Sequence, residues 1–247
     1  MLKLALFNVK NIVRSKPFKY LIIAAFLYSL MWLIEGQSRS FVLETYVIEF
    51  GRFLYTIILY ASLSVMRNDI ITDTIKTLFT GVSSRTKIMI SKLLSLIILG
   101  FIFSLIVELD GFLLSILDWR KIGVIGFLKL PHLKIILTYV VITFSVGAFM
   151  ILINSIIFKR GKNILSTILF LSAVNFYNAF VVTLAYKDIE FAEKISFYAK
   201  TPFYIWTDLL LKLKLESLDI NEVLMAIAYG LIFSACSILI LNKREIK

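Results

Sequence analysis

The chain has 247 residues, of which 60% are hydrophobic and 17% charged, and its mean hydropathy is strongly positive. This composition excludes an ordinary soluble domain, and apolar runs of about 20 residues predict an all-α, polytopic membrane protein. The formal charge of +11 is explained by basic residues flanking membrane helices, so we expect no nucleic-acid partner. One cysteine and one histidine exclude a disulfide framework or a zinc site within one chain.

Residues 1–16 predict an amphipathic helix lying along the inner membrane face. Lys3, Lys10 and Arg14 share one side of a helical wheel and would face anionic headgroups. A frayed basic tail is the alternative. The apolar side is formed by Leu2, Ala5, Leu6, Val9, Ile12 and Val13.

Six apolar segments follow, each long enough to cross about 30 Å of hydrocarbon as a helix. No linker or repeat divides them, so we expect one domain over 1–247. The predicted spans are 18–34, 46–66, 93–117, 134–158, 164–186 and 223–241.

The distribution of basic residues predicts the orientation. Sixteen of the 27 lysines and arginines lie in intervals 1–19, 67–92, 159–163 and 242–247, which total 56 residues. The remaining 11 lie in the 70 residues of the opposite intervals. Because cytoplasmic loops carry the excess of Lys and Arg, we expect both termini to be cytoplasmic and the chain to lie in the plasma membrane.

The longest charged interval on that side, 67–92, connects the second and third spans. It holds an amphipathic segment, a break at Gly81 and a Ser83-Ser84 pair suited to capping a helix that restarts at Arg85. We expect a short coupling helix within 68–91 to which a separate partner protein can bind.

Nucleotide and catalytic motifs are missing from the sequence. The only Gly-Lys pair, Gly161-Lys162, lacks the first glycine of a phosphate-binding loop. Neither H-E-x-x-H nor G-x-S-x-G occurs. We expect no enzyme activity and no cofactor in this chain, although a Ser/Lys or paired-Asp mechanism stays open.

Glu108 and Asp110 are the main ionisable residues inside a predicted span. They could form a cation or proton site, which is the basis of an alternative function as an ion-coupled transporter or channel. The favoured interpretation is a hydrated pair near the outer headgroups, about 24 Å into the helix, with Arg120 or Lys121 in reach.

Polar residues within two spans could line a translocation path, because such groups are costly against lipid. Hydrogen bonding between helices explains them as well. The candidates are Tyr55, Thr56 and Tyr60 in the second span and Asn175, Tyr177 and Asn178 in the fifth.

The segment 187–222 before the sixth span is too apolar for a free loop. Aromatic residues, Trp206 among them, crowd around Pro202. We expect one or two short interfacial or re-entrant helices on the outer side. They would either cap a pathway or serve packing alone.

The interval 67–92 also carries a family motif. Acidic residues, a threonine, a short apolar helix, a Gly-x-Ser-Arg-like turn and a lysine follow one another. In order, these are Asp69 and Asp73, Thr74, Ile75, Leu78 and Phe79, Gly81-Val82-Ser83-Ser84-Arg85, and Lys92. With the six-span layout, this pattern resembles the permease subunit of type V ABC exporters, the ABC-2-type permeases. Asp73 departs from it, since glycine usually precedes the threonine.

The resemblance implies a pair of permeases, two copies or two paralogues, bound to cytoplasmic ATPase subunits that hold ATP and magnesium. The residues implied to contact the ATPase are Asp69, Asp73, Thr74, Ile75, Leu78, Phe79, Ser84, Arg85 and Lys87. The second and fifth spans would line the path. Among such permeases the chain resembles those of Gram-positive bacteria that export phenol-soluble modulins or confer lantibiotic immunity. That likeness implies a bacterial exporter of an amphipathic peptide, and a lipid or drug substrate stays open.

Overall fold

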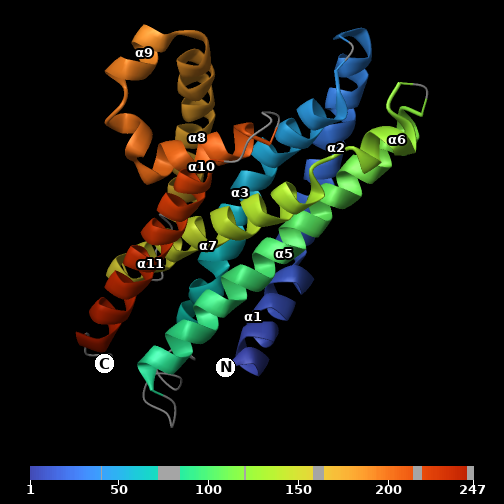
Figure 1. The fold of residues 1–247 in the computed structure, drawn as a ribbon. Helices are drawn as coiled ribbons and strands as arrows, with labels where there is room; N and C mark the ends of the chain where they lie inside the picture. The colour runs from blue at the N-terminus through green and yellow to red at the C-terminus, as the bar shows by residue number, and fades with distance from the viewer. Residues whose placement is uncertain (40, 72–83, 120, 158–163, 214–218, 244–247) are drawn as a thin grey trace.

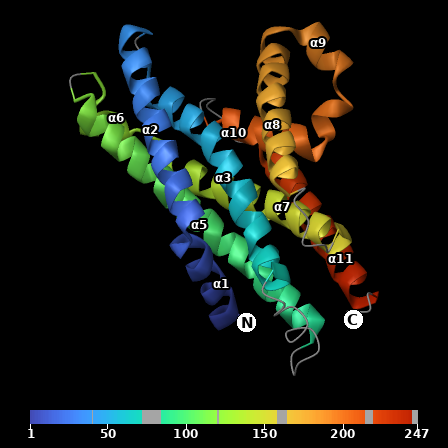
Figure 2. The same cartoon turned by 180° about the vertical axis from the view of Figure 1, so that it is seen from behind.

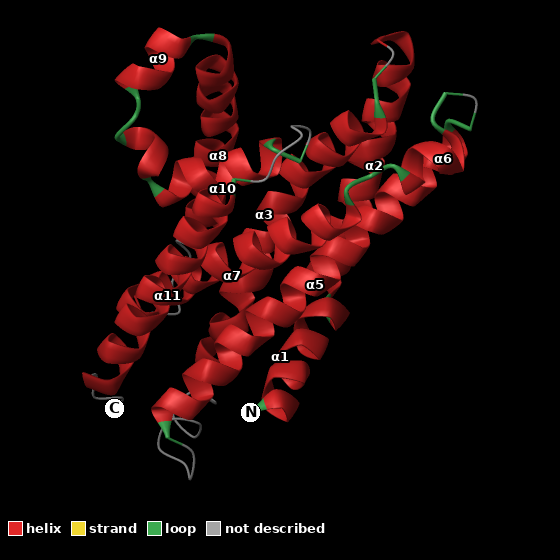
Figure 3. Ribbon diagram, viewed as in Figure 1, coloured by secondary structure: helices red, strands yellow, loops and turns green. Residues whose placement is uncertain are grey.

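The computed structural model describes residues 1–39, 41–71, 84–119, 121–157, 164–213 and 219–243, and every regular element in these residues is a helix (Figure 3). There are ten α-helices and one 3-10 helix in these ranges. They are α1 (Leu2–Arg14), α2 (Lys16–Arg39), α3 (Leu43–Ile71), α5 (Arg85–Leu117), α6 (Gly123–Leu128), α7 (His132–Ile157), α8 (Ile164–Lys187), α9 (Ile189–Lys194), η1 (Tyr198–Lys200), α10 (Pro202–Leu211) and α11 (Ile220–Lys243).

Six helices in the described part of the chain are long and apolar enough to cross a membrane, which confirms the six predicted spans. They are α2, α3, α5, α7, α8 and α11. The largest boundary difference is at α5, which begins at Arg85, eight residues before the predicted Leu93. The hydroxyl of Ser84 accepts a hydrogen bond from the backbone N–H of Lys87 at 3.4 Å. The helix therefore starts at the predicted cap and includes a polar first turn that the apolar run does not cover.

Helix α7 lies at the centre of the bundle and packs against α3, α5, α10 and α11 (Figure 1). The spans α3 and α7 are 72% and 67% buried, whereas only 22% of α2 and of α11 is buried. The main apolar core is therefore built from α3, α5 and α7. A smaller apolar cluster, Val181, Val182 and Tyr204, joins α8 to α10.

Helices α5 and α7 approach closely at Gly100. A Cβ atom on this residue would lie 2.7 Å from Cα of Val140, which is backbone and cannot move aside. Small residues commonly permit such crossings between membrane helices. Gly100 therefore sets the separation of the two helices.

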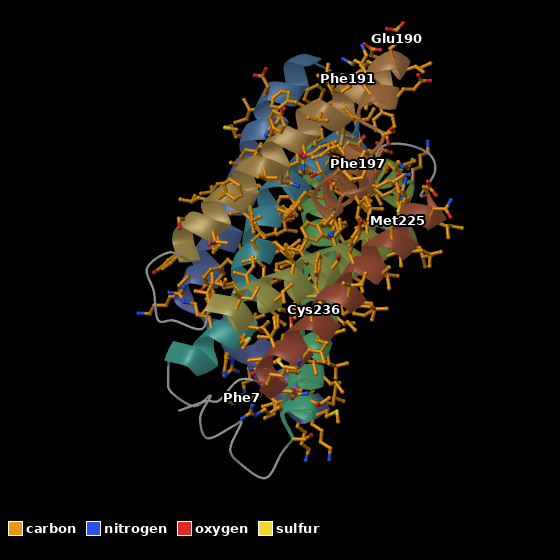
Figure 4. All side chains as sticks on the ribbon, turned by 90° about the vertical axis from the view of Figure 1, so that its left-hand side faces the viewer. Phe7, Glu190, Phe191, Phe197, Met225 and Cys236 are labelled. Carbon is orange, nitrogen blue, oxygen red and sulfur yellow. The ribbon has the colours of Figure 1, made fainter. Side chains whose placement is uncertain are left out.

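The start of α1 and the end of α11 lie at one end of the bundle, and α6 and α9 lie at the other (Figures 1 and 2). Figure 4 shows Phe7 of α1 and Glu190 of α9 at these opposite ends. An even number of crossings requires both termini on one side, and the structure agrees.

The segment before the last span contains α9, η1 and α10, which confirms that it is helical. The short helix α6 falls in the predicted outer loop between the third and fourth spans and was not expected. Its sequence, GVIGFL, is apolar but too short to produce a periodic pattern that sequence reasoning can read.

Candidate functional site: the buried helix α10 and the two ends of the bundle

Helix α10 is short and buried, and it lies between α8, α7 and α11 (Figure 1). Thr201 precedes it in an extended conformation, and Pro202 occupies the first turn, where its missing N–H costs no hydrogen bond. All residues from 204 to 210 are buried. Such a segment needs internal partners for its polar groups, and the neighbouring helices supply them.

Two of the predicted path residues bind this segment. The Asn175 amide donates to Thr207 Oγ1 at 2.9 Å, and the Asn178 amide donates to the carbonyl oxygen of Phe203 at 3.0 Å. The Tyr198 hydroxyl donates to Asn178 Oδ1. Both asparagines therefore join α8 to the segment α10–η1, which is the helix–helix alternative that the sequence left open.

The remaining predicted path residues do not share one surface. Tyr55 is buried in α3, and the Thr56 hydroxyl donates to Ser172 Oγ of α8 at 3.0 Å. Tyr60 is partly buried against the core. Tyr177 is 66% exposed. Their assignment to a translocation path stays a prediction.

Trp206 anchors α10 to the centre of the bundle. Its indole N–H donates to Ser145 Oγ of α7 at 2.8 Å, and the side chain is fully buried. The rings of Phe149, Phe203 and Phe233 lie within 6.5 Å of the Trp206 ring. Trp206 is therefore enclosed by protein, and its polar N–H has a hydrogen-bond partner inside the bundle.

A charged network closes the far end of α10. Lys212 Nζ lies 3.3 Å from Asp208 Oδ2 and contacts Glu222 Oε1 at 2.5 Å. The Tyr186 hydroxyl donates to Asp208 Oδ1 at 2.9 Å. Partial burial would lower the pKa of Lys212, but the hydrogen bond to Glu222 and the two carboxylate charges outweigh it and raise that pKa. Burial and the same carboxylates raise the pKa of Tyr204 to about 12.

Most of the predicted ATPase-contacting residues lie outside the described residues. These are Asp73, Thr74, Ile75, Leu78 and Phe79. Asp69 falls in the last turn of α3, which continues to Ile71, five residues beyond the predicted end of the second span. The predicted coupling helix therefore stays a prediction.

The structure describes the interval 67–92 again from Ser84 onward, and there Arg85 binds another helix of the same chain. Its guanidinium donates to the carbonyl oxygens of Leu241 at 2.8 Å and Asn242 at 3.4 Å. These carbonyls belong to the last turn of α11, where a cation is favourable because the helix dipole is negative. Lys87 is exposed. Arg85 thus ties the start of α5 to the end of α11.

The predicted helix α1 is present, and Ala5, Val9 and Ile12 of its predicted apolar side are buried. Leu2 and Leu6 are exposed, whereas Asn8 is buried against α5. Buried Lys92 donates to Asn8 Oδ1 at 3.1 Å, and the Asn8 amide donates to Ser95 Oγ at 3.4 Å. Sequence reasoning placed Lys92 directly before the third span and had no signal for its partner.

Glu108 and Asp110 have separate environments. Asp110 is only 2% exposed and accepts a hydrogen bond from Ser29 of α2 at 2.9 Å. The expected hydrated pair is therefore wrong for Asp110, because α2 covers this face of α5. Glu108 Oε2 lies 2.7 Å from His132 Nδ1, which joins α5 to the start of α7.

Among the described residues, no group of three or more His, Cys, Asp or Glu side chains is arranged to hold a metal ion. The architecture, with six long apolar helices, is that of a polytopic membrane protein. No protein-family model matches the chain, and no curated protein sequence matches it.

Proposed function

We propose that this chain is the transmembrane permease subunit of an ATP-driven ABC exporter, working with a separate cytoplasmic ATPase. The proposal rests on the motif in residues 67–92, the charge distribution and the resemblance to type V permeases. ATP and magnesium would be held by the partner. Closure of the ATPase subunits would move the connection between α3 and α5 and rock the spans in alternating access.

The observation that most supports the proposal is the arrangement of helices at the end that carries both termini. The start of α5 is tied to α11 through Arg85 and to α1 through Lys92. A force applied to the connection before Ser84 would therefore reach three helices rather than one. A coupling element requires such rigid attachment.

The exposed apolar face of α8 supports a second permease subunit or lipid beside it. This face is formed by Leu169, Phe170, Phe176, Tyr177, Phe180 and Leu184. The resemblance to type V ABC permeases implies that the second and fifth spans of two protomers enclose the path. Helix α8 is the fifth span of this chain. The substrate we propose is an amphipathic or hydrophobic molecule, with a cytolytic or antimicrobial peptide as the best candidate.

A second candidate function is ion-coupled transport through Asp110. The specific observation is that Asp110 lies inside a span and is only 2% exposed, and that its carboxyl group accepts a hydrogen bond from Ser29. Buried intramembrane carboxyls often mark proton or cation pathways. This candidate needs no ATPase partner, which separates it from the first.

Affinity purification of the detergent-solubilised chain from its native membrane tests the exporter proposal. We expect a P-loop ATPase to co-purify in defined stoichiometry, and we expect ATP-dependent export on reconstitution of the two. An unrelated polytopic protein purified in parallel serves as the control. A chain that transports on its own, with no ATPase bound, would refute the proposal.

A further inference from the structure

A cleft of about 260 Å³ with three charged residues in its lining opens where the outer segment meets the last span. It lies between the end of α8, the short helix α9, α10 and the start of α11, near the upper end of the molecule in Figure 1. Three alanines, Ala185, Ala192 and Ala199, line it and leave the space open.

The charged lining of the cleft is unbalanced. Asp208 and Glu222 contribute two carboxylates, and Lys212 contributes one ammonium. Lys134 of α7 lies within electrostatic reach of Lys212 but does not line the cleft. The lining therefore attracts a positive group more strongly than a negative one.

One carboxylate oxygen of a lining residue has no hydrogen-bond partner. Both oxygens of Asp208 have partners, from Tyr186 and Lys212, and Glu222 Oε1 contacts Lys212. Glu222 Oε2 is buried and has no hydrogen-bond partner. Leaving such an acceptor unpaired costs about 1–3 kcal/mol, and more when it is charged. A bound N–H donor would remove that cost.

The remaining lining favours an organic cation over a metal ion. Tyr186 and Tyr204 line the cleft. Aromatic rings attract ammonium groups through their electron-rich faces. A hard metal ion requires six or more oxygen ligands, and an ammonium requires few acceptors and tolerates apolar walls. The alanines are suited to the methylene groups that an organic ammonium carries.

We propose that this cleft binds a primary ammonium group, with Glu222 Oε2 accepting its hydrogen bond and the rings of Tyr186 and Tyr204 beside it. This binding does not depend on the exporter proposal. Because the lining comes from α8, α9, α10 and α11, a bound amine would link the outer segment to two spans and stabilise them together.

Ligand-dependent thermal unfolding of the purified full chain in detergent tests the site. We expect n-propylammonium chloride to raise the melting temperature saturably. Equal concentrations of sodium chloride, or of tetramethylammonium chloride, which has no N–H donor, are expected to give no saturable rise. A rise equal to that of either salt, or no saturable rise at all, would overturn the proposal.

Two variants locate the effect. Glu222→Gln replaces the free acceptor, and Ala192→Leu fills the cleft without changing any charge. We expect each variant to require at least tenfold more n-propylammonium for the half-maximal shift. Glu193→Gln, on the exposed side of α9 and outside the lining, is the matched control and should respond as the native chain does. A native response in both cleft variants would contradict the assignment.

Discussion

At the scale of single residues, three of the polar side chains predicted to line a path link helices to one another. Asn175, Asn178 and Thr56 were predicted to be polar groups facing protein or water, and each has a hydrogen-bond partner on another helix. The positions of such residues could be predicted from the sequence, because polar groups in a span avoid lipid. Their partners could not, since Ser29 and Asp110 lie 81 residues apart in the chain.

Replacing Asn178 with leucine should destabilise the outer segment. The variant removes the hydrogen bonds to the Phe203 carbonyl and the Tyr198 hydroxyl, and we expect a loss of about 1–3 kcal/mol in the free energy of unfolding. Denaturant unfolding in detergent measures it. Tyr177→Leu, on the exposed side of the same turn, is the control and should change stability little. Equal effects of the two variants would contradict the linking role.

Replacing Asp110 with asparagine separates the two candidate functions. Asparagine keeps an acceptor for the Ser29 hydroxyl but cannot carry a proton or a charge, so the fold should survive. The exporter proposal predicts near-native export in reconstituted vesicles that contain the ATPase. Loss of transport by this variant, with its melting temperature unchanged, would favour ion coupling.

At the scale of helices, all six spans and the helical outer segment were predicted, because long apolar runs determine membrane helices almost alone. The face that each helix buries was less predictable. Helix α1 buries Asn8 and exposes Leu2 and Leu6, because its partner is a buried lysine on α5. This pairing leaves no local signal in the sequence. The apolar composition of 187–222 predicts short helices there, but it does not identify the helices against which α10 is buried.

The close crossing of α5 and α7 predicts a strong effect of one methyl group. Gly100→Ala places a Cβ atom against the Val140 backbone, and we expect the free energy of unfolding to fall by about 1–3 kcal/mol. Ala235→Val, on the exposed face of α11, adds more volume and should be tolerated. Thermal unfolding of both variants in detergent provides the comparison, and a stable Gly100→Ala protein would mean that the helices can separate without cost.

Two neighbouring cations at the start of α5 should respond differently to charge reversal. Arg85→Glu places a carboxylate beside the Leu241 carbonyl and removes a favourable cation worth about 0.5–1 kcal/mol, so it should lower the melting temperature. Lys87→Glu changes only an exposed residue and should leave the melting temperature unchanged. Under the exporter proposal, Lys87→Glu should nevertheless reduce export, which a vesicle transport assay measures. Native export by this variant would show that Lys87 does not contact the ATPase.

At the scale of the whole molecule, the two ends of the bundle have different structures. One end carries α1, the start of α5 and the end of α11, joined by Arg85 and Lys92. The other carries α6, α9, η1 and the charged network of Lys212. Under the exporter proposal, the end with both termini would meet the ATPase and the opposite end would release the substrate.

Site-specific photo-crosslinking in the native membrane tests the central claim most directly. A photoreactive residue replaces either Lys87, at the end proposed to meet the ATPase, or Lys187, an exposed lysine at the opposite end. We predict that the probe at position 87 captures a P-loop ATPase and that the probe at position 187 does not. Capture from position 187 alone, or no ATPase captured from position 87, would contradict the proposed coupling.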